Sequence, residues 1–114
     1  MREYMLVMTG AAKTWKGLGP EENQRLMEKY HAFVDTLRKG KGFTGGSALN
    51  QAGFGLRSDK NGVTVDGPFP ETKEVLKGYM IFKAENLEEA VELAKKCPAL
   101  THGESVQVFE LTEH

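Results

Sequence analysis

Apolar residues along the chain recur at two spacings, and these spacings predict strands and helices. Short apolar runs at 4–8 (YMLVM) and 79–84 (YMIFKA) are typical of strands that are apolar on both faces. The segment 105–111 (SVQVFEL) predicts a last strand. Weaker, glycine-rich patterns within 43–58 predict bent or bulged strands, and the turn signal at 60–62 (KNG) followed by VTV predicts another strand.

Two segments carry the spacing and the end signals of helices. Gly19 and Pro20 suit the cap and the first position of a helix that ends near Gly40. Asn86 suits the cap of a second helix, with Glu89 as its capping-box partner. The first apolar stripe consists of Leu26, Met27, Tyr30, Phe33, Val34 and Leu37, and the second of Leu87, Ala90, Val91 and Ala94.

The order of these elements predicts one domain that covers residues 1–114. The order is β-α-β-β-loop-β-α-β, without repeats or linkers. It favours an α+β fold, a ferredoxin-like βαββαβ sandwich with an antiparallel sheet and an extra hairpin.

The predicted strands are apolar on both faces, but only two helices are available to cover them. In this topology both helices pack on one face, so the second face needs another cover. The simplest cover is a second copy of the chain, related by a two-fold axis. We therefore expect a homodimer whose sheets enclose a barrel-like interior. The alternative is a monomer in which the loops 43–58 and 66–76 fold over that face.

Composition narrows the class of protein further. The formal net charge is −1 and no face is strongly basic, so we expect no nucleic-acid partner. No apolar run reaches the length of a membrane span and no signal peptide is recognisable, so we expect no membrane association and a cytoplasmic location. Cys97 is the only cysteine, and we expect a half-buried small residue there.

Several segments together resemble one known family. The stretch DGPFPETKE at 66–74, followed by GYMIF at 78–82, is similar to the signature of DGPF-domain proteins. The strand YMLVM, the helix with GPEE and YHAFVDTL, the stretch GGSAL and the final ESVQVFEL also resemble them. These proteins belong to the YCII-related group of the dimeric α/β-barrel superfamily, and the resemblance covers nearly the whole chain.

The resemblance implies the fold and the dimer, but no activity, because most members have none assigned. Some YCII-related enzymes are thought to use a histidine together with an aspartate. DGPF-like domains are sometimes associated with sigma-factor systems, which implies a non-enzymatic ligand-binding or regulatory accessory module as an alternative. Elsewhere the superfamily contains cofactor-free and haem-using monooxygenases; against haem, the sequence puts no histidine clearly on a cavity wall.

The loop that opens with Asp66 is the first candidate site. Asp66 ends a strand, Gly67 permits backbone conformations closed to other residues, and two prolines stiffen the loop. A carboxylate beside an apolar pocket suits proton transfer, so Asp66 or Glu71 is a candidate base. Phe69 is expected to line the pocket and Lys73 to neutralise a developing oxyanion. Alternatively, Asp66 only accepts hydrogen bonds from backbone N–H groups of its own loop, and the charged residues are solvated.

Two histidines are the candidate acid or orienting group. His31 lies at the edge of the first helical stripe, and His102 lies in the loop before the last strand. For both, a surface position without a chemical role is the alternative. Tyr30 and Trp15 are expected to border the pocket.

No set of residues has the spacing of a metal site, and no nucleotide-binding motif is present, so we expect no metal and no cofactor. The leading interpretation is a small dimeric protein that holds a small organic molecule in a cavity. Its chemistry would be proton transfer of the isomerase or lyase kind.

Overall fold

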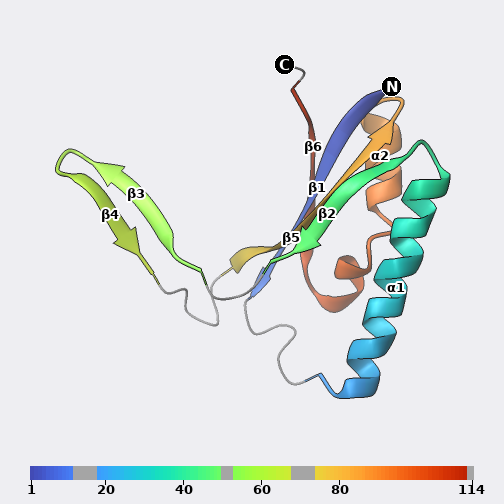
Figure 1. Ribbon diagram of the computed structural model, residues 1–114, viewed down its shortest axis with the longest axis horizontal. Coiled ribbons are helices and arrows are strands. Elements are labelled where there is room, and N and C mark those ends of the chain that lie inside the picture. The colour runs from blue at the N-terminus through green and yellow to red at the C-terminus, as the bar shows by residue number, and fades with distance from the viewer. Residues whose placement is uncertain (12–17, 50–52, 68–73, 113–114) are drawn as a thin grey trace.

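The structure is a computed structural model, and it describes residues 1–11, 18–49, 53–67 and 74–112 (Figure 1). These described residues form two α-helices, one 3-10 helix and six strands in one α+β arrangement. Their order is β1 (Arg2–Ala11), α1 (Pro20–Lys39), β2 (Phe43–Ala48), β3 (Gly55–Asp59), β4 (Gly62–Asp66), β5 (Glu74–Ala84), α2 (Leu87–Ala94), η2 (Pro98–His102) and β6 (Ser105–Glu110).

Four strands form one antiparallel sheet in the order β2-β5-β1-β6, and β3 and β4 form a separate two-stranded hairpin. The sheet pairs strands that are distant in sequence, as a βαββαβ core requires. The predicted mixed fold, the antiparallel sheet and the extra hairpin are therefore confirmed. The hairpin turn is fixed by Asp59, whose Oδ1 accepts from the backbone N–H of Asn61 at 2.8 Å, and by Gly62 at φ +117°.

The predicted starts of both helices are confirmed. Helix α1 begins at Pro20 after Gly19, and helix α2 begins after Asn86. The side chain of Asn86 accepts from the backbone N–H of Glu89 at 2.9 Å, so the expected cap is present. Neither described helix combines the length and the apolar character needed to cross a membrane.

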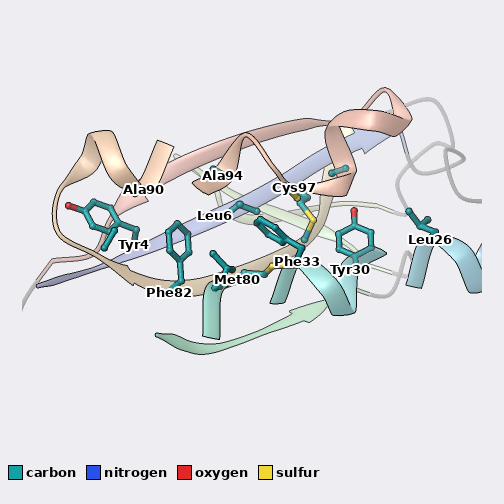
Figure 2. Close-up of a cluster of buried hydrophobic side chains, with 14 residues drawn as sticks. Tyr4, Leu6, Leu26, Tyr30, Phe33, Met80, Phe82, Ala90, Ala94 and Cys97 are labelled. Atoms are coloured by element: carbon teal, nitrogen blue, oxygen red, sulfur yellow. The ribbon is translucent and has the colours of Figure 1, made fainter. Parts of the chain in front are cut away.

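Both helices pack on the same face of the sheet and enclose the core there (Figure 2). Tyr4, Leu6 and Met8 of β1 point to this face, as do Met80 and Phe82 of β5. The helices contribute the buried side chains of Leu26, Tyr30, Phe33, Leu37, Ala90 and Ala94. Because strand side chains alternate, the residues between these strand positions must lie on the opposite face of the sheet.

The opposite face is apolar as well, and we call it the open face. The register places Met5 beside Ile81 and Phe109, and Val7 beside Tyr79. Phe109 is 51% exposed, and Met5, Tyr79 and Ile81 are partly exposed. The sequence-based expectation of an apolar second face is therefore confirmed.

Three details differ from the sequence-based expectations. Strand β5 begins at Glu74, so part of the expected loop is strand, and η2 after Pro98 was not expected. Cys97 is 1% exposed rather than half-buried, because it lies inside the core cluster (Figure 2). The described hairpin extends away from the sheet (Figure 1). Residues 50–52 and 68–73 of the two loops that the monomer alternative would fold over the open face lie outside the described residues.

Candidate functional site

A cavity of about 320 Å³ lies between α1 and the sheet edge formed by β2 and β5. Its apolar walls are formed by Met8, Met27, Val34, Phe43 and Met80. The other lining residues include Tyr30, His31, Ser47, Lys77 and Tyr79, and Tyr79 borders the cavity from a strand position whose side chain faces the open face. The cavity opens to solvent at this edge, because His31 and Ser47 are exposed. A mostly apolar recess with a few polar groups is the usual form of a small-molecule site.

Lys77 reaches the helix side of the sheet because β5 contains a β-bulge. Met8 pairs with Gly78 and Thr9 pairs with Leu76, so Lys77 is the additional residue between them. A bulge redirects a side chain that regular alternation would place on the other face. The side chain of Lys77 is accordingly 3% exposed, and Lys77 is one of the residues that line the cavity.

A buried carboxylate accompanies this buried ammonium group. Nζ of Lys77 lies 3.5 Å from Oε2 of Glu104, whose side chain is 0% exposed, and Nζ donates to the backbone oxygen of Ala11 at 3.0 Å. Gly10 makes room for Glu104, since a Cβ at Gly10 would lie 2.9 Å from Cγ of Glu104. A charge is tolerated in such a place only when it is paired, so the two side chains form one unit.

Two further polar side chains lie within electrostatic reach of Glu104. Burial raises the pKa of the Tyr30 hydroxyl well above its ordinary value of 10.0, and Cys97 and Glu104 raise it further. Burial also raises the pKa of the Cys97 thiol above its ordinary value of 9.0; a hydrogen bond with the backbone of Ala99 lowers it, and Glu104 raises it. Both groups therefore stay neutral near pH 7. Together with its burial, the raised pKa of Cys97 disfavours the role of a thiolate nucleophile.

The cavity brings together two of the predicted site residues. Tyr30 and His31 are neighbours on α1 and both line it. Tyr30 belongs to the core cluster, whereas His31 is exposed at the cavity mouth. His31 therefore lies on a cavity wall, which differs from the expectation that no histidine is clearly placed on one.

Asp66 and His102 are not among the described residues that line this cavity. Asp66 ends β4 on the hairpin, and its Oδ2 accepts from Nε of Arg57 at 2.9 Å. The side chain of Asp66 is 48% exposed. His102 lies on η2, and its Nε2 is buried without a hydrogen-bond partner among the described residues. Trp15, Phe69, Glu71 and Lys73 lie outside the described residues.

Gly67 has a different role from the one expected of it. It does not adopt a positive φ, unlike Gly42, Gly62 and Gly103. A Cβ at Gly67 would lie only 2.2 Å from Cδ1 of Phe54. The residue is therefore glycine because the Phe54 ring occupies the space above it.

Sequence reasoning missed Lys77 and Glu104. One signal was present, since a lysine inside the apolar stretch EVLKGYMIF is unusual in a buried strand. Its direction could not be read from the sequence, because strict alternation places residue 77 on the same face as Tyr79. The bulge that changes this depends on the pairing with β1.

A larger recess of about 920 Å³ lies where β1, β5 and β6 end near the chain termini. Its walls include Arg2, Glu3, Lys83 and Glu110. Arg2 and Glu110 form an ion pair there and are 63% and 40% exposed. Such a wide, charged and solvated surface offers little desolvation to a ligand, so we regard the smaller cavity as the candidate site.

The part of the chain that the structure describes contains no group of three or more His, Cys, Asp or Glu side chains that could hold a metal ion. In comparisons with known proteins, the family model of the YCII-related domain matches residues 3–112. A search of curated proteins finds no match.

Proposed function

The chain belongs to the family of YCII-related domains, and we propose that it binds a small organic molecule in the cavity between α1 and β2. The observation that carries this proposal is Lys77, a residue of the mostly apolar cavity wall whose charged side chain is buried. Cavities of about 150 Å³ hold one benzene molecule. The volume of about 320 Å³ therefore suffices for a ring with a short polar substituent.

The charge of the site selects the polar end of the ligand. Glu104 already balances the positive charge of Lys77. A ligand carboxylate would therefore add an uncompensated negative charge in a buried place, which is costly. A neutral oxygen acceptor, such as a ketone carbonyl, carries no such cost and can accept a hydrogen bond from the ammonium group. The preferred ligand is thus an aromatic or aliphatic carbonyl compound.

Proton transfer next to that carbonyl is the second part of the proposal. His31 and Lys77 line the same cavity, and histidine is the side chain best suited to move a proton near neutral pH. When a carbon beside the carbonyl loses its proton, negative charge develops on the carbonyl oxygen. The ammonium group of Lys77 would stabilise that charge. Isomerisation and elimination reactions begin with this step.

For the assembly, we propose that the open face packs on the open face of a second copy. The support is the row of apolar side chains at Met5, Val7, Ile81 and Phe109 on the face opposite both helices. Two such faces related by a two-fold axis would enclose a barrel-like interior.

Nuclear magnetic resonance with acetophenone and benzene as probes tests the proposed site. We expect acetophenone to shift the amide signals of residues around the cavity and to bind more tightly than benzene. In the double variant Lys77→Met/Glu104→Gln the preference for acetophenone should fall at least several-fold, because the ammonium donor is gone. Lys83→Met is the matched control, since Lys83 is an exposed lysine on the same strand. Equal preference in both variants would refute the role of Lys77.

The same samples in D₂O separate an enzyme from a binding module. An enzyme should accelerate exchange of the acetophenone methyl protons for deuterium, and His31→Ala should remove that acceleration while binding persists. Binding without any acceleration would favour the non-enzymatic alternative, a ligand-binding or regulatory accessory module.

A further inference from the structure

The hairpin of β3 and β4, which we call the arm, extends from the rest of the molecule (Figure 1). The radius of gyration is 15.9 Å, whereas a compact chain of this length has a radius of about 13 Å. The extended arm contributes to this difference (Figure 1). A two-stranded hairpin alone in water is at best marginally stable, so the arm requires a partner surface.

One face of the arm is polar and satisfied by its own contacts. Arg57 binds Asp66 through Nε at 2.9 Å and approaches Asp59 at 3.8 Å. The hydroxyl of Thr64 donates to Oδ2 of Asp59 at 2.9 Å. These contacts hold the two strands together on the side that remains in water.

The other face of the arm is apolar. Leu56 lies opposite Val65, Ser58 lies opposite Val63, and the ring of Phe54 lies over Gly67. Leu56, Val63 and Val65 are 68%, 73% and 61% exposed, and Phe54 is 64% exposed. The arm is therefore amphipathic, with its apolar side in water in the single chain. Such a patch marks an interaction surface.

We propose that the apolar face of each arm packs on the open face of a second copy of this chain, near Phe109 on the edge strand β6. The open face is apolar and is exposed at Phe109, so the same chain carries both surfaces. A two-fold axis then covers two arms and two open faces with identical contacts. The arm thus extends the sheet-to-sheet contact proposed above and does not depend on the ligand cavity.

The area of this contact is adequate for a stable dimer. Burying one Val, Leu or Phe side chain removes on the order of 100 Å² of apolar surface from water, so the arm offers about 400 Å². The arm covers a similar area on its target, and the symmetry repeats the contact. The total is about 1,600 Å², the size of a standard specific interface.

Sedimentation velocity of two matched variants tests the proposal. Leu56→Lys places a charge on the apolar face of the arm, and Thr64→Lys places the same charge on its polar face. We expect Leu56→Lys to raise the dimer dissociation constant at least tenfold and Thr64→Lys to leave it within about twofold of the parent. Equal dimerisation of both variants, or a parent that stays monomeric at 100 micromolar, would overturn the proposal.

Cross-linking identifies the surface on which the arm lies. Ser58→Cys puts a thiol on the apolar face of the arm, and Gln107→Cys puts one on the open face two residues from Phe109. With a flexible bismaleimide, a mixture of the two variants should give cross-linked dimers, and neither variant alone should. Cross-links in Ser58→Cys alone would contradict the proposal. A double variant with both cysteines that gives cross-links only within one chain would contradict it as well. Cys97 is buried and should not react.

Discussion

Two ion pairs among the described residues differ sharply in exposure. Arg57 and Asp66 on the arm approach to 2.9 Å and are 59% and 48% exposed. Lys77 and Glu104 are 3.5 Å apart and are 3% and 0% exposed. The exposed pair has the shorter distance, but water screens it, so the loss of either partner should change the free energy of unfolding little. Removal of one partner matters most where the other is left buried and charged.

The most recognisable sequence motif and the candidate binding cavity lie in different parts of the described structure. Asp66 opens the DGPF stretch, which is the most recognisable part of the sequence. Among the described residues, however, it contacts Arg57 on the arm and does not line the cavity. Lys77 belongs to no motif noted in the sequence, yet it is the charged side chain in the cavity wall. The burial and orientation of a charged side chain are therefore better guides to the site than its place in a recognisable motif.

The largest effect is expected from removing one charge of the buried pair. Lys77→Met leaves Glu104 buried without its cation, so the free energy of unfolding should fall by about 3–5 kcal/mol. The double variant Lys77→Met/Glu104→Leu should recover most of that loss, because no charge remains buried. Urea unfolding measures both changes. A loss below about 1 kcal/mol in the single variant would show that the buried and exposed pairs are equivalent.

A smaller effect is expected from crowding the same pair. Gly10→Ala brings a Cβ to 2.9 Å from Cγ of Glu104, and overpacking of this kind costs about 1–3 kcal/mol. Gly45→Ala is the matched control, because a Cβ at Gly45 meets no atom within 4 Å. Thermal unfolding of the two variants compares them. An equal loss of stability in the two variants would show that Glu104 can shift away from residue 10. The buried pair would then be held less firmly than its burial implies.

The smallest effect is expected on the arm. Asp66→Asn weakens an exposed pair, so the free energy of unfolding should change by less than about 1 kcal/mol. Binding of acetophenone should be unchanged, since Asp66 is not among the described residues that line the cavity. Urea unfolding and the binding titration measure the two quantities. If the folded variant lost acetophenone binding, Asp66 would belong to the binding site, and the exposed pair would matter for function.

Much of the fold is predictable because its signals are local. Pro20 and the acidic first turn define the start of α1, and Asn86 with Glu89 defines the start of α2. The apolar second face follows from alternation alone. The position of the hairpin does not follow from the sequence, since Leu56 and Val65 are equally compatible with covering the sheet or with extending from it.

The candidate site is less predictable because it depends on pairing between distant strands. His31 and Tyr30 follow from the helical stripe, and both line the cavity. Lys77 points inward only because β5 gains one residue relative to β1. Glu104 fits only because Gly10 lies opposite on the neighbouring strand. Neither relation is visible within a window of a few residues.

The bulge at Lys77 means that one inserted or deleted residue can change the polarity of the cavity. On one side of the bulge, Gly78 and Met80 face the helices; on the other side, Leu76 and Thr9 face away from them. The loss of this single residue would restore plain alternation and remove the only ammonium group from the described cavity wall, while Tyr79–Ala84 kept its partners. The insertion or deletion of one codon can therefore change the lining of the cavity between apolar and polar while the strand pairing stays the same.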